Sequence, residues 1–160
     1  MERAETMVRL YAVRHGEKER GRDPALTPAG LERAGALATT LADEPITVVF
    51  TSDYRRCQET IAPLARARGL EPIVIEAADP HRQLAALHAL PAGTTAILCG
   101  HANTVPQMIQ ALGGRCPDLQ FGMIPEAVHD RLFRVDFPAG GGVGETEVVV
   151  QHFGARSTGA

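Results

Sequence analysis

The stretch MVRLYAVRHG, residues 7–16, decides the fold that this sequence predicts. Residues 7–13 are mostly apolar and include two valines, which is typical of a short strand buried inside a sheet. The polar tripeptide Arg14-His15-Gly16 follows this strand directly. Because a parallel α/β sheet binds its ligands outside the carboxyl ends of its strands, we expect the tripeptide at a functional edge.

Strand and helix signals alternate along the rest of the chain. Strands are predicted at residues 7–13, 46–50, 72–75, 94–99, 131–137 and 145–151, and helices at 27–43, 52–69, 80–90 and 104–112. Four strand–helix pairs followed by two strands predict a three-layer α/β/α sandwich, with a mostly parallel sheet and an antiparallel C-terminal edge. Thr27 and Ser52 are predicted to cap the first two helices, and Leu31 to face the core.

Length and composition indicate one domain. The chain has 160 residues, of which 44% are hydrophobic, so it can bury a sizeable core without a disulfide or a structural metal. We expect this domain to span residues 1–153, and the small, polar residues 154–160 to form a flexible tail.

The cysteines and the N-terminal residues predict a cytoplasmic protein. Cys57, Cys99 and Cys116 are odd in number, far apart and without a CxxC pair, which favours reduced thiols. The first residues lack the apolar segment of a signal peptide, and the apolar runs elsewhere are too short to cross a bilayer. We therefore expect no membrane partner.

The charge balance excludes one class of partner and favours another. Against 19 Asp and Glu the chain has 16 Lys and Arg, so its net charge of −3 lacks the basic excess of a nucleic-acid-binding protein. Every basic residue except Lys18 is an arginine, whose planar fork of N–H donors suits oxyanions.

Basic and imidazole side chains follow three of the predicted strands. Arg14 and His15 follow the first strand, Arg55 and Arg56 open the helix after the second, and His101 follows the fourth. The carboxyl ends of parallel strands meet at one edge of a sheet, so two imidazoles and at least two guanidiniums are expected to converge there. A phosphoryl group suits such a site, because forked arginine donors and helix N-termini match its oxygens.

Three motifs at these strand ends resemble those of the histidine phosphatase superfamily, also called phosphoglycerate mutase-like. They are RHG at residues 14–16, TSDYRRCQET at residues 51–60 and GHANT at residues 100–104. The helix opening LTPAG at residues 26–30 is similar to the one common in this family. The three motifs occur in the family's order, and the resemblance covers most of the chain.

The resemblance implies a role for each motif residue. It assigns His15 as the nucleophile, Arg14 and Arg56 as phosphate clamps, and His101 as the second histidine of the pocket. Arg56 fits the motif better than Arg55, because it stands four residues after the motif serine.

Elementary chemistry supports these roles. A neutral imidazole nitrogen of His15 is a nucleophile near pH 7, and a phosphohistidine intermediate divides hydrolysis into two easier steps. The other ring nitrogen must then donate a hydrogen bond, which we expect a backbone carbonyl to accept. Gly16 is expected at the substrate, and Asn103 to cap the last helix or to reach a phosphate oxygen. Because arginines supply the positive charge, we expect no metal and no other cofactor.

A leaving alkoxide also needs a proton, which one carboxylic acid can supply before it activates water. The family usually places this acid after the third strand, which favours Asp79, with Glu76 and Glu17 as alternatives. A phosphoramidate or acyl phosphate would make a strong acid dispensable. The small phosphohistidine phosphatases of the family resemble that case.

The sequence therefore predicts a metal-independent phosphatase acting through a phosphohistidine on His15. Its substrate would be a phosphomonoester or a phosphohistidine, carried by a small molecule or a phosphoprotein. A phosphoglycerate-type mutase is an alternative, although the short connection at residues 75–80 leaves little chain for a lid that excludes water. A catalytically silent module that binds phospho-ligands is another, although it would need no nucleophile.

Overall fold

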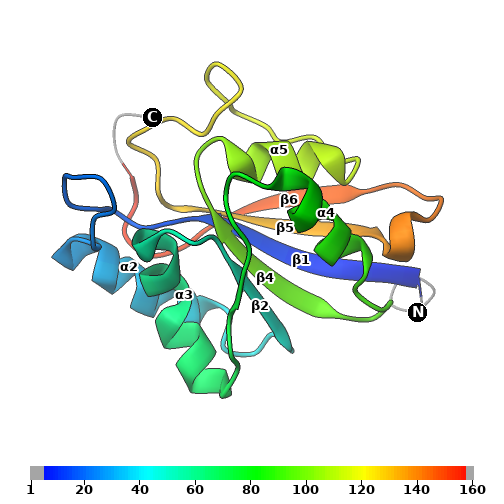
Figure 1. The fold of residues 1–160 in the computed structure, drawn as a ribbon, viewed down its shortest axis with the longest axis horizontal. Coiled ribbons are helices and arrows are strands. Elements are labelled where there is room, and N and C mark those ends of the chain that lie inside the picture. The colour runs from blue at the N-terminus through cyan, green and yellow to red at the C-terminus, as the bar shows by residue number, and fades with distance from the viewer. Residues whose placement is uncertain (1–5, 158–160) are drawn as a thin grey trace.

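A computed structural model describes residues 6–157 of the chain, and Figure 1 shows their central sheet and the helices that cover it. The strands are β1 (Met7–Arg14), β2 (Val48–Thr51), β3 (Ile73–Val74), β4 (Thr95–Gly100), β5 (Arg131–Pro138) and β6 (Glu147–His152). The helices are α2 (Pro28–Thr40), α3 (Arg55–Arg68), α4 (Pro80–His88) and α5 (Thr104–Ala111), with a 3-10 turn at Ala139–Gly141. Every predicted strand and helix is present, with small shifts at the ends.

The first strand lies inside the sheet, whose order is β3-β2-β4-β1-β5-β6. The pairs β1–β4, β4–β2 and β2–β3 are parallel, whereas β5 pairs antiparallel with both β1 and β6. The predicted fold class, a mostly parallel sheet with an antiparallel C-terminal edge, is confirmed.

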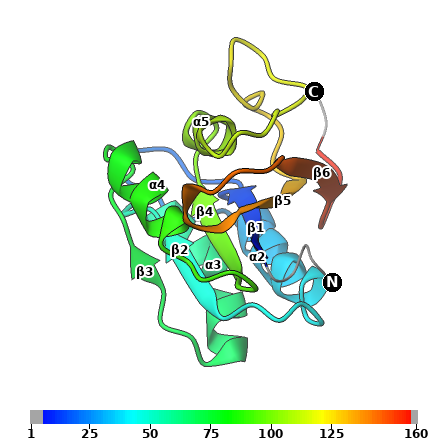
Figure 2. The ribbon, with the colours of Figure 1, turned by 90° about the vertical axis from the view of Figure 1, so that its right-hand side faces the viewer.

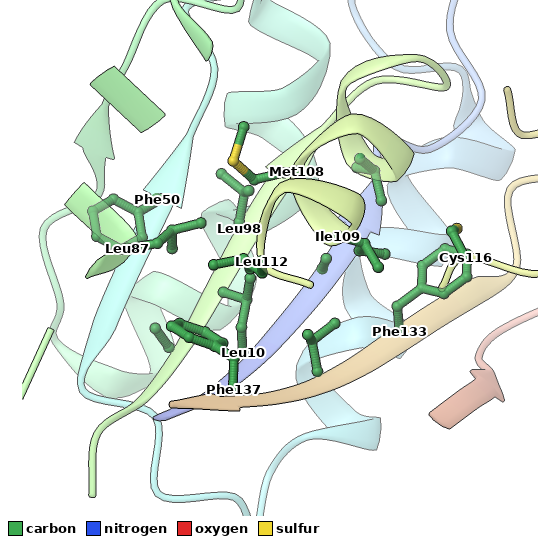
Figure 3. Close-up of a cluster of buried hydrophobic side chains, with 14 of the residues drawn as sticks. Leu10, Phe50, Leu87, Leu98, Met108, Ile109, Leu112, Cys116, Phe133 and Phe137 are labelled. Carbon is green, nitrogen blue, oxygen red and sulfur yellow. The ribbon is translucent and has the colours of Figure 1, made fainter. Parts of the chain in front are cut away.

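Alternate residues of β1 face opposite layers of helices, which Figure 2 shows on the two sides of the strands. Leu10 and Ala12 are buried with side chains of α4 and α5, whereas Tyr11 and Val13 pack with α2 and α3. Figure 3 shows the first of these clusters, with Leu10 and Ile109 of α5 among the labelled side chains. Because apolar side chains fill both faces, polar chemistry is confined to the edges of the sheet.

Two predictions about the helices are wrong. Thr27 caps α2 as expected, by accepting a hydrogen bond from a first-turn amide at 3.1 Å. Ser52 does not cap α3, because its hydroxyl pairs with His101 and Tyr54 occupies the N-cap position without a side-chain bond. Leu31 is 55% exposed, because it points away from the buried stripe of α2.

The loop that follows β1 is anchored on α2. The Arg33 guanidinium, on a residue that is 3% exposed, donates to both carboxylate oxygens of Glu17 at 2.9 and 2.8 Å. The Glu17 carbonyl oxygen accepts from the Thr27 N–H at 2.9 Å, and it lies so close to Gly30 that a Cβ there would overlap it. This packing holds the chain directly after His15.

The described chain ends beside the start of β5. The Ser157 N–H donates to Asp130 Oδ2 at 3.1 Å, and Ser157 Oγ accepts from the His129 N–H at 2.8 Å. Residues 158–160 of the predicted tail and residues 1–5 lie outside the described residues, so the domain boundary stays a prediction. Within the described part of the chain, no helix has the length and apolar character needed to cross a lipid bilayer.

Gly30→Ala is expected to destabilise the protein, because the new Cβ forces the Glu17 carbonyl away from α2. Overpacking of this kind costs about 1–3 kcal/mol of unfolding free energy. Gly35→Ala is the matched control, since Gly35 lies in the same helix with open space where its Cβ would be. Alanine's higher helix propensity should there add up to about 1 kcal/mol. Urea unfolding measures both changes, and equal stabilities would contradict this packing argument.

Candidate active site

Segments that follow β1, β2, β3 and β4 surround one pocket of about 400 Å³. Its lining residues are Arg14, His15, Lys18, Tyr54, Arg56, Ala77, Ala78, His101, Ala102, Asn103 and Thr104. This set contains two histidines and three basic side chains, and it contains no Asp or Glu. A larger cavity of about 710 Å³, lined by the ends of α5 and β5, contains none of the predicted site residues.

His15 is buried, and one backbone contact orients its ring. The residue is 3% exposed, and its Nδ1 lies 2.8 Å from the Gly16 carbonyl oxygen. A carbonyl oxygen only accepts, so Nδ1 carries the proton and Nε2 keeps a free lone pair. Burial, with the positive charge of Arg14 nearby, lowers the pKa of His15 to about 3. The neutral ring, with Nε2 unprotonated, is therefore the form present near neutral pH.

His101 lies beside His15, with the two ring centroids 5.4 Å apart and the planes inclined at 63°. The Nε2 atom of His101 is 2.9 Å from Ser52 Oγ, and its backbone N–H donates to Thr104 Oγ1 at 2.9 Å. The Tyr54 ring packs edge-on against it at a centroid distance of 5.0 Å. The serine of the second motif thus supports the second histidine instead of a helix.

Three backbone carbonyl groups hold Arg14 in place. Its Nη1 donates to the carbonyl oxygens of Pro125, Glu126 and Val128 at 3.2, 2.8 and 2.9 Å. Its Nε is buried and has no hydrogen-bond partner within the described part of the chain. Burial lowers the pKa of the guanidinium to about 10, which still leaves it positive at neutral pH. A buried N–H without a partner is a donor that a bound anion would satisfy.

Arg56 enters the pocket stacked on Tyr54, with its guanidinium carbon 4.5 Å from the ring centroid. Its Nε is also buried, and none of residues 6–157 accepts a hydrogen bond from it. The Arg55 side chain, in contrast, is 60% exposed and pairs with Glu59 at 2.6 Å. Of the two neighbouring arginines, Arg56 is therefore the one at the pocket.

The structure places Asn103 at the pocket and Gly16 outside its lining. The Gly16 N–H donates to Thr60 Oγ1 at 2.9 Å, and Gly16 is not among the lining residues. Gly16 therefore supports His15 from outside the pocket. Asn103 lines the pocket and occupies the N-cap position of α5 as expected, but its side chain makes no capping hydrogen bond with the described residues. Its contact with a phosphate oxygen stays a prediction.

None of the three carboxylates considered as the proton donor lines the pocket. Asp79 occupies the N-cap of α4, where its carboxylate accepts from the Arg82 N–H at 3.1 Å and satisfies the helix end. Hydrogen bonds from Arg33 lower the pKa of Glu17 to about 2, and Glu76 is exposed. The expected proton donor is therefore not beside the nucleophile.

Sequence reasoning missed His129, which contacts His15. Its Nδ1 lies 3.0 Å from the His15 carbonyl oxygen, and the two ring centroids are 5.9 Å apart. His129 belongs to no motif and no periodic element, so nothing local in the sequence marks it. Thr60, the last residue of the second motif, accepts a hydrogen bond from the Gly16 N–H through its hydroxyl oxygen.

Comparison with known proteins finds related sequences and related folds. Residues 10–78, which include His15 and Arg56, match the model of the histidine phosphatase superfamily, branch 1. The resemblance to the histidine phosphatase superfamily is confirmed. An uncharacterised protein of Mycobacterium tuberculosis H37Rv is 38% identical over 82 residues, which cover 44% of this chain and 41% of the relative. The chain thus matches about two fifths of the length of this curated relative.

Solved structures of histidine phosphatases and related proteins share the fold over most of the chain. The protein histidine phosphatase SixA complexed with tungstate is 17% identical with a TM-score of 0.72, covering 90% of this chain and 96% of that chain. A mycobacterial glucosyl-3-phosphoglycerate phosphatase is 16% identical with a TM-score of 0.63, covering 91% and 99%. A phosphoglycerate mutase from Plasmodium falciparum is 18% identical with a TM-score of 0.60, covering 95% and 93%. These likenesses concern the fold.

The low pKa of His15 predicts how stability depends on pH. Between pH 6.5 and about 3, the unfolded state binds a proton that folded His15 does not bind. Acidification through this window therefore lowers the unfolding free energy, by at most about 1.4 kcal/mol per pH unit for this one proton. His15→Asn should make the dependence shallower, because asparagine does not titrate. Urea unfolding at pH 7 and pH 4.5 tests this, and an unchanged slope in the variant would contradict a buried, neutral His15.

Proposed function

We propose that this protein is a phosphatase that transfers a phosphoryl group first to Nε2 of His15 and then to water. One observation carries the proposal: the neutral imidazole of His15 lines the same pocket as Arg14 and Arg56, whose buried Nε–H groups have no partner among the described residues. A nucleophile surrounded by forked cationic donors suits a phosphoryl group. The sequence match to histidine phosphatases over residues 10–78 supports the same reaction.

In the first step, Nε2 attacks phosphorus, and the leaving group departs with the electron pair of its bond to phosphorus. Arg14, Arg56 and His101 stabilise the negative charge on the phosphoryl oxygens. The bond from Nδ1–H to the Gly16 carbonyl stabilises the positive charge that the ring acquires. In the second step, water attacks phosphorus, the N–P bond breaks, and phosphate and a proton are released. Side chains supply the positive charge in this scheme, which needs no metal or cofactor.

The proposed substrate class follows from the supply of protons. An alkyl phosphate loses a strongly basic alkoxide and depends on an acid, whereas an acyl phosphate or a phosphorylated imidazole has a better leaving group. The pocket lining contains no Asp or Glu. We therefore favour a phosphohistidine, or another phosphoramidate or acyl phosphate, over an alkyl phosphomonoester. The carrier would be a phosphoprotein or a small molecule, and the fold neighbour SixA is named a protein histidine phosphatase.

The two alternatives fit the pocket less well. A mutase must shield its phosphohistidine from water, yet the connection between β3 and α4 consists of residues 75–79 only. A silent binding module has no use for a buried, neutral imidazole whose Nε2 is bare. The expected cytoplasmic location agrees with three buried free thiols, Cys57, Cys99 and Cys116.

A quench experiment tests the covalent route. The protein is mixed with a phosphohistidine peptide carrying labelled phosphorus and quenched in alkali. We expect an acid-labile, base-stable label on wild type and no label on His15→Asn. Turnover without this label would contradict the covalent route, and binding without turnover would favour the silent module.

A substrate comparison tests the substrate class. Turnover of the phosphohistidine peptide should exceed that of glycerol phosphate by about 100-fold or more, which is what a missing general acid typically costs. Faster turnover of glycerol phosphate would contradict the proposed class and indicate that an acid reaches the pocket.

Arg56→Gln is expected to lower kcat/KM by about 100- to 1,000-fold, because losing one donor to a transition-state oxyanion typically costs about 2.7–4 kcal/mol. Arg55→Gln is the matched control, since the Arg55 side chain is exposed and pairs with Glu59. Exposed pairs contribute little, so this variant should stay within about 3-fold of wild type. Steady-state kinetics on one substrate compares them, and equal losses would place Arg56 outside the site.

A further inference from the structure

We infer that His129 is a positioning residue that fixes the peptide unit between His15 and Gly16 and, through it, the ring of the nucleophile. The inference rests on the proposed function, in which His15 is phosphorylated. His129 is not among the residues that line the pocket, so its effect passes through His15 and not through the substrate.

His129 belongs to a segment, residues 124–130, that connects two of the loops around the pocket; we call it the strap. At its start, the Ile124 N–H donates to the Ala102 carbonyl oxygen at 3.0 Å, in the loop after β4. Three strap carbonyls in its middle accept from Arg14 Nη1. At its end, the His129 ring reaches the carbonyl oxygen of the nucleophile at 3.0 Å. The strap therefore joins the loop after β4 to the end of β1.

The peptide unit between His15 and Gly16 is held at both of its polar atoms. Its carbonyl oxygen accepts from His129 Nδ1 at 3.0 Å, and its N–H donates to Thr60 Oγ1 at 2.9 Å. The next carbonyl group, that of Gly16, is the acceptor that orients the His15 ring at 2.8 Å. Glycine restricts its own backbone only weakly, so these contacts must supply the restraint. Rotation of the peptide unit would move the acceptor and tilt the ring.

His129 is itself anchored. Its backbone N–H donates to Ser157 Oγ at 2.8 Å, on the last described part of the chain. Because the His15 carbonyl oxygen only accepts, Nδ1 of His129 carries the proton. Burial, and then the nearby Arg14, lower the pKa of His129, so near neutral pH its ring adds no further positive charge beside that guanidinium.

Two substitutions of His129 test whether its hydrogen bond to the His15 carbonyl oxygen matters, or only the presence of a side chain at this position. His129→Asn keeps an N–H donor near the position of Nδ1, whereas His129→Leu removes the donor. We expect His129→Leu to slow phosphorylation of His15 by about 10- to 100-fold, since a small misplacement of a reacting group has effects of that size. His129→Asn should stay within about 3-fold of wild type, because the donor is retained. Tungstate affinity, measured by calorimetry, should change little in both, because the anion is held by the arginines.

A spectroscopic readout does not depend on activity. The ¹⁵N chemical shifts of the His15 ring should show protonated Nδ1 and bare Nε2 in wild type and in His129→Asn. In His129→Leu, both tautomers should be populated. Thermal unfolding shows whether each variant is folded. If His129→Leu does not fold, Ser157→Ala, which loosens the His129 backbone only, should show the same changes in milder form.

The outcomes separate this inference from the proposed function. A folded His129→Leu with the wild-type phosphorylation rate and His15 tautomer overturns the positioning role. Equal losses in His129→Leu and His129→Asn also overturn it, because the donor would then be irrelevant. If wild type itself acquires no phosphate on His15, the proposed function fails, while the ¹⁵N shifts of the variants still decide whether His129 orients the ring.

Discussion

The candidate active site depends on the hydrogen bond from Nδ1–H of His15 to the carbonyl oxygen of Gly16. An exposed histidine is partly protonated near pH 7 and exchanges its proton between two nitrogens. Burial removes the first ambiguity, because it lowers the pKa of His15 to about 3. The hydrogen bond removes the second, because it assigns the proton to Nδ1 and leaves Nε2 bare. Burial and one bond together give the neutral ring with a bare Nε2 that the proposed phosphoryl transfer requires.

The positive charge of Arg14, beside His15, is held by backbone carbonyl groups and so stays available to a bound anion. A buried guanidinium is usually paired with a carboxylate, which would cancel the charge that a phosphoryl group needs. Arg14 is held by carbonyl dipoles from the strap, and its Nε remains without a partner. Glu17, the carboxylate nearest in sequence, is bound by Arg33 on α2. The ion pair stabilises the loop, while Arg14 and Arg56 line the pocket.

The lining of the pocket, and not the fold, distinguishes between reactions. Proteins named as phosphatases and a phosphoglycerate mutase share this sandwich, so the architecture alone does not select a chemistry. Small side chains such as Ala77 and Ala78 line the pocket where an acid was expected. Asp79, one residue further on, is turned to the N-terminus of α4. Asp79 therefore caps a helix, although the residue directly before it, Ala78, lines the pocket.

The sequence by itself determined the order of the elements and three of the four segments that surround the pocket. Apolar runs, helix starts and residues at strand ends are local signals, and parallel strands bring their ends to one edge whatever the loops do. Only the tertiary structure decided which groups meet: Ser52 with His101, Asp79 with its own helix, and His129 with a residue 114 positions away. Such contacts depend on how segments without periodicity fold back over the sheet. No local pattern encodes that path, because it results from satisfying buried donors and acceptors across the whole chain.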